Sequence, residues 1–342
     1  MHQFFRAASL TPQTFNSIYV DDKDIGLFTS GLIPIRPSNV DPGLPLDGRG
    51  TEEWRGFVSF GNHPQGINPP SGEIVNWNNR PQAGYQAPSD NWSLGAVHRV
   101  DLLLHNLGSG AHLTPASLVA AMNEAATQDV REMTLEPVLS KLLRTGTAPN
   151  ARDATMLSVL DDWHAHGGSR LDRTGIGQIT DPGAAVMDTA WPLLAGAWAS
   201  SVLSPSLQAQ LNAIQPQFDA PFSGPVQPLG REQTKGWFIY MDKDLRAILG
   251  EHVQGAFNVR YCGAGNLTRC RALLWAAIDK AGNQLAATQG ANPLAWHSDA
   301  NRERITWVPA LNVLPSMRYT NRPTGLQQVI SFTGHAPADT GR

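Results

Sequence analysis

The chain has 342 residues and a formal net charge of -3, and its Lys and Arg residues do not cluster. The sequence therefore shows no basic stripe for nucleic acid and no polybasic run for a membrane, and no apolar stretch approaches the roughly 20 residues of a transmembrane helix. Hydrophobic residues make up 41% of the chain, enough for a large core, while 32 glycines and 25 prolines indicate many turns. This length corresponds to about two domains.

The first part of the chain is rich in β-forming residues. The run TFNSIYV, the turn DDKD and the run IGLFTSGLIPI predict a β-hairpin over residues 15–35. Turn residues dominate residues 36–72, which we expect to be coil. Residues 73–77 are predicted to form a short strand, and this strand leads into the sequence NWNN, in which three asparagines surround Trp77.

From residue 98 the apolar residues follow a helical period. Thr114 is the expected N-cap of one helix, with Pro115 at its first position. Helices are expected over residues 98–107, 114–130, 137–144, 154–164, 182–203, 206–214, 243–249 and 267–287. Strand composition returns from Ile305 onward. The sequence therefore predicts an α+β protein with β-rich ends, residues 1–97 and 301–342, around a mainly helical lobe, residues 98–300.

Two motifs that suggest metal sites have simpler interpretations. His164 and His166, in DDWHAHGG, have no further ligand nearby in sequence, so we interpret them as a helix C-terminus, where histidine interacts favourably with the helix dipole. The segment DRTGIGQITD, residues 172–181, has Ile176 where a calcium loop needs an oxygen ligand, so we interpret it as a turn.

The sequence leaves two interpretations open for each of two other features. A side-chain amide can stabilise an oxyanion in a dry site, so NWNN is either a catalytic donor loop or a turn held by its asparagines. Cys262 and Cys270, eight positions apart, form either a local disulfide or two independent thiols. Two thiols without further ligands do not complete a zinc site.

The segment NPPSGEIVNWNNRPQAGYQAPSD, followed by HRVDLLL, resembles the penicillin acylase (penicillin amidase) family of N-terminal-nucleophile hydrolases. The resemblance extends back through TFNSIYVDDKDIGLFTSGLIPIR, DPGLPLDG and EEWRGFVSF, and forward through MRYTNRPTGLQQVISF. It implies part of an αββα sandwich, with the helical lobe inserted between the β-rich ends. It also implies a hydrolase of linear amides.

The resemblance assigns roles to individual residues. Asn78 matches the side-chain donor of the oxyanion hole. Arg99 matches an arginine that orients this asparagine and the substrate, for which its fixed fork of donors is suited. Phe15 matches a wall of the acyl pocket. Asp90 and the backbone carbonyl of Pro42 match ligands of a structural calcium ion, which takes hard oxygen ligands.

Members of the family attack the amide with the N-terminal serine of a mature β-chain, whose own amine is the base, and form an acyl-enzyme. Neither Ser9 nor Ser17 has the matching context. We therefore expect this chain to be the C-terminal part of a β-chain, inactive alone, whose partners are the N-terminal β-chain part and the α-chain of the same precursor. The family is exported, which implies a periplasmic or secreted location and a Cys262–Cys270 disulfide.

The expected substrate is a small N-acyl compound, such as a β-lactam with a side-chain amide. Within the family, the alternative is an acyl-homoserine lactone acylase. Outside it, the alternative is a non-catalytic or decayed fragment that acts as a binding module, because ten tryptophans and Asn-rich loops suit a sugar-binding surface. A split protein completed by a neighbouring gene product is a third alternative.

Overall fold

The structure is a computed structural model. It describes residues 1–41, 45–85, 98–108, 113–172, 174–214, 240–254, 258–299, 305–307, 317–319, 330 and 332. The chain forms two compact units, one of Met1–Ser93, Leu107–Ser117 and Gln327–Arg342 and one of Leu94–Asn106 and Leu118–Leu326. The sequence predicted domain boundaries after residues 97 and 300. In the structure the first boundary follows Ser93, and the last segment of the first unit begins at Gln327.

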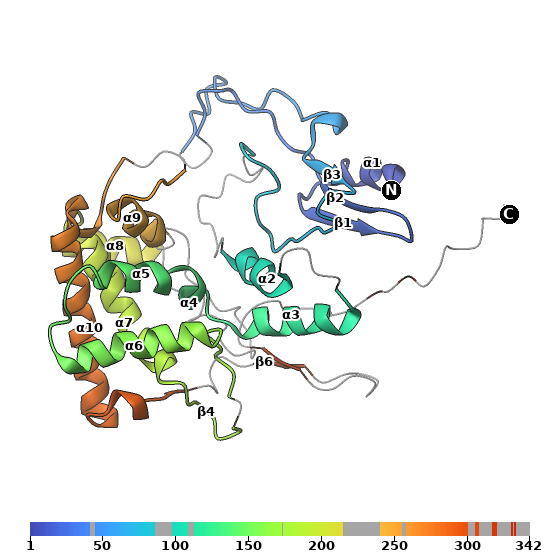
Figure 1. The fold of residues 1–342 in the computed structure, drawn as a ribbon. Helices are drawn as coiled ribbons and strands as arrows, with labels where there is room; N and C mark the ends of the chain where they lie inside the picture. Colours follow the sequence, from blue (N-terminus) through green and yellow to red (C-terminus); the bar gives the residue numbers. More distant parts are fainter. Residues whose placement is uncertain are drawn as a thin grey trace. The chain divides into compact units, whose positions relative to one another are not determined.

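The first unit contains a short helix and a three-stranded sheet (Figure 1). Its elements are α1 (His2–Ala8), β1 (Asn16–Val20), β2 (Ile25–Thr29), the 3-10 helix η1 (Phe60–Asn62) and β3 (Gln65–Ile67). β1 pairs antiparallel with β2, so that Asn16 lies opposite Thr29, and β3 pairs antiparallel with the other side of β2. The predicted hairpin is therefore confirmed.

Two predictions for this unit were wrong. Residues 73–77 contain no strand, and residues 36–72 are not coil throughout, because η1 and β3 lie within them. Both edges of β2 are already paired, with β1 and β3, so the central strand offers residues 73–77 no free edge. The sequence also missed α1, which has no side-chain N-cap and buries Phe5.

A stack of three rings forms the core of the hairpin region. The buried rings of Phe5 and Phe28 have centroids 4.9 Å apart, and buried His63 stacks on Phe28 at 5.2 Å. His63 Nδ1 lies 2.8 Å from the carbonyl oxygen of Thr29, at the end of β2. Gly26 lets α1 approach β2 closely, because a Cβ there would lie 2.8 Å from the Phe5 ring.

Helices dominate the rest of the chain (Figure 1). They are α2 (Arg99–Leu107), α3 (Pro115–Thr127), α4 (Val130–Thr134), α5 (Glu136–Leu143), α6 (Ala151–Ala165), α7 (Pro182–Ala199), α8 (Pro205–Ile214), α9 (Tyr240–Ile248) and α10 (Leu267–Gln289), with the 3-10 helices η3 (Cys262–Gly265) and η4 (Pro293–Ala295). Every predicted helix is present, and among the described α-helices of this part of the chain α4 is the one that was not expected. Thr114 caps α3 as predicted, since its Oγ1 accepts a hydrogen bond from Ser117 N at 3.1 Å.

The described strands of the second unit form two short antiparallel pairs. β4 (Gln178–Ile179) pairs with β5 (Ser298–Asp299), and β6 (Ile305–Trp307) pairs with β7 (Met317–Tyr319). The strand composition predicted from Ile305 onward is confirmed at β6 and β7. With the many helices and few strands, these pairs confirm the predicted α+β class.

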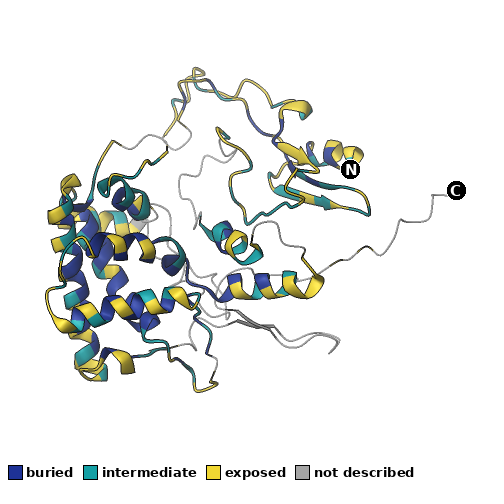
Figure 2. Cartoon of the chain, in the orientation of Figure 1, coloured by how far each residue is buried: buried dark blue, intermediate teal, exposed yellow. Residues whose placement is uncertain are grey.

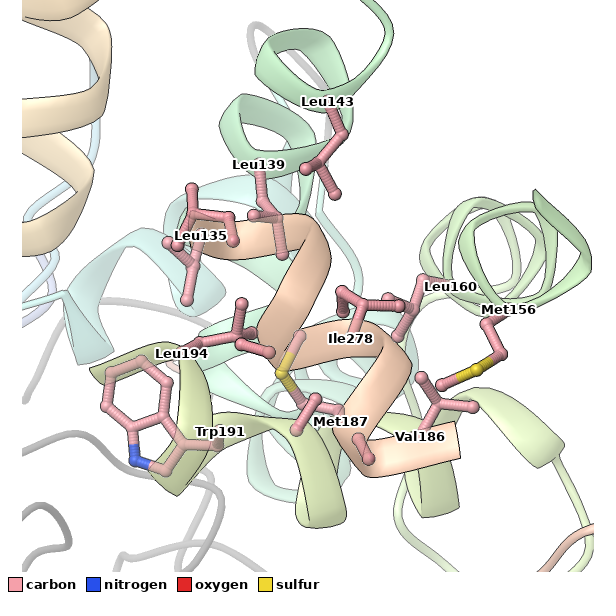
Figure 3. Packing of buried hydrophobic residues seen from close by; sticks show 14 of the residues in the cluster. Leu135, Leu139, Leu143, Met156, Leu160, Val186, Met187, Trp191, Leu194 and Ile278 are labelled. Atoms are coloured by element: carbon pink, nitrogen blue, oxygen red, sulfur yellow. The ribbon is translucent and has the colours of Figure 1, made fainter. Parts of the chain in front are cut away.

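One hydrophobic core holds the second unit together. Buried residues concentrate on the facing sides of α5, α6, α7 and α10 (Figure 2). In Figure 3, Met187, Leu194 and Ile278 come together from α7 and α10. Gly183 brings α7 against α6, because a Cβ there would lie 2.3 Å from the Cβ of Trp163. Among the described residues, no helix has the length and apolar character to cross a membrane.

Two arginines and two aspartates form a buried ionic cluster in this unit. Arg131 Nη2 donates to Asp129 at 2.5 Å and to Asp188 of α7 at 2.7 Å, and Arg170 donates to Asp188 at 2.9 Å. Ser298 of β5 donates a further hydrogen bond to Asp188 at 2.5 Å. Burial by itself would raise the pKa of Asp188, but Arg170 and Arg131 outweigh it and hold this pKa far below its usual range. Asp188 therefore joins α4, α7 and β5.

Replacing Asp188 by asparagine should destabilise the second unit strongly. The substitution leaves two buried guanidinium groups short of negative charge, and breaking a buried pair costs about 3–5 kcal/mol. Asp279→Asn is the matched control, because the Arg152–Asp279 pair at 2.7 Å is partly exposed and such pairs contribute about 0–1 kcal/mol. Urea unfolding followed by circular dichroism measures both, and equal losses in the two variants would contradict this expectation.

A disulfide joins Cys262 of η3 to Cys270 of α10, with the two Cα atoms 4.9 Å apart. Asp244 of α9 anchors the loop around it, since its Oδ2 accepts hydrogen bonds from Cys262 N at 2.9 Å and from Trp198 Nε1 at 2.6 Å. The Cys262–Cys270 loop is therefore fixed to both α7 and α9.

A thiol titration checks this disulfide directly. The unfolded, unreduced chain should react with no thiol reagent, because its cysteines, Cys262 and Cys270, are both in the bond. After reduction both should react. Two reactive thiols before reduction would refute the pairing.

Candidate functional site

The NWNN loop is tied to the hairpin by one side chain. Asn16, the first residue of β1, donates through Nδ2 to Asn76 Oδ1 at 3.0 Å and to the carbonyl oxygen of Asn79 at 2.7 Å. The loop is also closed on itself, because Asn79 Oδ1 accepts a hydrogen bond from Trp77 N at 2.9 Å. Asn76 and Asn79 are therefore the structural asparagines of the loop.

Asn78 differs from its neighbours in conformation and exposure. Its φ angle is 58°, in the left-handed region that asparagine tolerates better than most residues. Asn76 and Asn79 are partly buried, whereas Asn78 is exposed. Within the part of the chain that the structure describes, no protein group bonds to its side-chain amide, so two N–H donors are available to a ligand.

Phe15 lies directly before β1 and lines an open pocket of about 580 Å³. Its backbone continues the hairpin, because Phe15 N donates to Ser30 Oγ at 3.1 Å and Ser30 N donates to the Phe15 carbonyl at 2.8 Å. The side chain is 58% exposed, which suits a surface that a ligand or another segment covers. The pocket is lined by Phe4, Ala7, Ala8, Thr11, Pro12, Gln13, Phe15, Ser17 and Ser30.

The roles of the remaining predicted site residues stay predictions. Arg99 begins α2, in the second unit, and its role beside Asn78 stays a prediction. The predicted calcium ligands, Asp90 and Pro42, lie outside the described residues. Among the residues that are described, no group of three or more His, Cys, Asp or Glu is arranged to hold a metal ion.

The first part of the segment DRTGIGQITD forms the predicted turn, around Asp172, whereas Gln178–Ile179 form β4. The carboxylate of Asp172 accepts hydrogen bonds from Thr174 N at 2.9 Å, Gly175 N at 2.7 Å and Gly177 N at 2.6 Å. Burial would raise the pKa of Asp172, but these N–H groups, Gly177 first, outweigh it and lower the pKa to about 2. The carboxylate is thus occupied by the backbone of its own loop.

His164 has a partner that the sequence did not indicate. Its Nδ1 lies 2.5 Å from Oε1 of Glu132, a buried residue of α4, while His166 caps the end of α6 as predicted. Burial, and next the charges of Asp129 and Glu136, raise the pKa of Glu132 to about 9. Burial lowers the pKa of His164. At neutral pH a protonated Glu132 therefore donates to a neutral imidazole.

Glu132→Gln should make the second unit more stable at high pH. The pKa of Glu132 is raised on folding, from 4.5 to about 9, so its contribution is fully present below pH 4.5 and is lost as the pH rises toward 9. Glutamine cannot ionise, so the variant escapes this loss and should gain several kcal/mol over the parent at pH 9, since one pKa unit corresponds to about 1.4 kcal/mol.

Unfolding free energies measured from pH 5 to pH 9 test this expectation. Glu124→Gln is the control, because it removes the same charge from an exposed position on α3. A Glu132→Gln variant whose stability follows the parent curve at every pH would show that Glu132 is ionised in the folded protein.

Comparisons with known proteins agree with this architecture. The family model for penicillin amidase matches residues 1–332. Penicillin G acylase of Escherichia coli is 35% identical over 129 residues, which are 37% of this chain and 15% of that protein. A solved structure of a thermostable penicillin G acylase from Alcaligenes faecalis has the same fold, with a TM-score of 0.68 and 21% identity over 94% of this chain.

The α+β fold is thus shared with a penicillin G acylase. The chain belongs to the penicillin amidase family. It spans 56% of the solved relative's chain.

Asn16 holds the NWNN loop of this site, and the sequence did not reveal that role. It lies in the β-rich run TFNSIYV, and its partners are 60 and 63 positions away. The only signal was the residue type, because asparagine is a poor strand former.

Proposed function

We propose that this chain supplies the oxyanion-stabilising part of an amide hydrolase of the penicillin amidase type. The observation that carries the proposal is Asn78, whose exposed and unused amide projects from a loop fixed on both sides. When a nucleophile adds to an amide carbonyl, negative charge develops on the carbonyl oxygen. A preorganised amide N–H aimed at that oxygen stabilises the transition state more than the ground state.

The proposed reaction uses a serine outside this chain. The serine hydroxyl adds to the carbonyl carbon, and its proton passes through the serine's own amine to the leaving nitrogen. The C–N bond breaks, the amine leaves, and water then releases the acid from the acyl-enzyme. Neither early serine fits this role, since Ser9 is buried with its hydroxyl bonded to the Arg6 carbonyl and Ser17 lies within β1.

The other residues complete the proposed site. Phe15 forms one wall of the pocket for the acyl group, and Arg99 orients Asn78 and the substrate. Asp90 and the Pro42 carbonyl would hold a calcium ion, whose preference for hard oxygen ligands they fit. The substrate is proposed to be a linear N-acyl compound, either a β-lactam side-chain amide or an acyl-homoserine lactone. The disulfide supports an exported location.

The test combines the chain with the segment that carries the nucleophile. The chain alone should not cleave a chromogenic N-phenylacetyl amide, whereas co-expression with that segment should give saturable turnover. In the combined enzyme, Asn78→Gly keeps the left-handed backbone but removes the donor, so kcat should fall by about 10²–10³-fold.

Asn68→Gly is the control for this backbone change, although it also removes the hydrogen bonds of the Asn68 side chain with Ile25 N at 3.0 Å and Asp24 at 2.8 Å. Asn68 is also exposed and also has a positive φ angle, 45°, but it lies in the turn beside β3. Its variant should keep the parent kcat. Full activity in Asn78→Gly would exclude the oxyanion role, and turnover by the chain alone would place the nucleophile within it.

A further inference from the structure

One side-chain amide on β1 uses all of its hydrogen-bonding groups to join three segments. Its two N–H groups bond to Asn76 Oδ1 and to the Asn79 carbonyl, at 3.0 and 2.7 Å. Its oxygen accepts a hydrogen bond from Thr29 Oγ1 at 3.0 Å, and Thr29 is the residue directly opposite on β2. Since the oxygen faces a hydroxyl donor, both N–H groups of Asn16 are directed at the loop.

The two loop contacts lie on either side of Asn78. One contact is to the side chain two residues before it, and the other is to the carbonyl of the residue after it. The Trp77 N to Asn79 Oδ1 bond closes the same turn. With both flanks held, the backbone at Asn78 stays in the left-handed conformation, and its Cα–Cβ bond has one direction relative to β1.

We propose that Asn16 is a positioning residue for the amide-hydrolysis site, holding Asn78 where its amide meets the developing oxyanion. The inference rests on the proposed function of Asn78. Its own hydrogen bonds run to Thr29, Asn76 and Asn79, so its proposed effect passes through the loop. Because the oxyanion exists only in the transition state, a displaced donor slows the chemical step and leaves ground-state binding unchanged. A displacement of about 1 Å can cost about 10²-fold in rate.

Asn16→Asp tests the contact in the combined enzyme. The variant keeps an acceptor for Thr29 Oγ1 but loses both donations to the loop. We expect kcat to fall by about 10–100-fold, with KM for the N-phenylacetyl amide within about twofold of the parent. Asn62→Asp, the same change at an exposed position of η1, should leave both constants unchanged. A rise in KM with unchanged kcat would overturn the proposal.

A double-mutant cycle separates positioning from general stabilisation. If Asn16 acts through Asn78, then Asn16→Asp should change kcat by less than about twofold once Asn78→Gly has removed the donor. Losses that multiply would mean that Asn16 acts elsewhere, and would overturn the proposal. Thr29→Val is a second, milder variant, because it removes only the hydroxyl that orients Asn16; a smaller fall in kcat, again without a change in KM, is expected.

Hydrogen exchange on this chain alone tests the contact without any activity. Peptides covering residues 74–82 should exchange faster in Asn16→Asp than in the parent, while peptides of β2 should be unchanged. Unchanged exchange in residues 74–82 would overturn the role of Asn16 even if Asn78 is the donor. Full activity of Asn78→Gly, by contrast, would overturn the proposed function itself.

Discussion

The hydrogen bonds of the Asn16 side chain determine how the candidate site is arranged. Asparagine is unfavourable in a strand, by an amount within the roughly 1 kcal/mol range of β-propensity. Its bonds to Thr29, Asn76 and Asn79 offset this cost, because each intramolecular hydrogen bond contributes about 1 kcal/mol. The NWNN loop needs this external support because it makes no β-sheet hydrogen bonds, since residues 73–77 pair with no strand. The backbone position of Asn78 is therefore set by the hairpin, through the hydrogen bonds of Asn16.

The two units achieve stability in different ways. The hairpin region relies on a small ring stack, Phe5, Phe28 and His63, and on local hydrogen bonds. The helical unit has an extended core of leucine, alanine and tryptophan, into which a neutral set of two arginines and two aspartates is inserted. The proposed oxyanion donor thus lies on the unit with the smaller core. Low local stability is common where ligands bind, and here a few directional bonds compensate for it.

The helices were predictable from the sequence because their signals are local. An apolar period and a cap at Thr114 lie within a few residues of the structure that they specify. The strands were harder, since a strand exists only with its partner: β3 is three exposed residues long, and residues 73–77 look β-rich but pair with no strand. The role predicted for Asn78 came from a family resemblance rather than from its local pattern.

Long-range polar contacts were beyond the sequence. Asn16 and Asn76 are 60 positions apart, and Arg131 and Asp188 are 57 apart. No periodicity connects such pairs, because the fold alone brings them together. Glu132 shows the same point: a glutamate on a short helix gives no sign that it will be buried and protonated against His164.

The adjacency of Phe15 and Asn16 has a consequence for how this protein can diverge. Successive residues of an extended chain point to opposite sides. The side chain of Phe15 therefore lines the pocket, while that of Asn16 holds the NWNN loop. A larger or smaller residue at position 15 that shifts the strand also shifts Asn16. Under the proposed function, selection for new acyl groups at this wall would therefore act on the reaction rate at the same time, because the two neighbouring side chains share one strand.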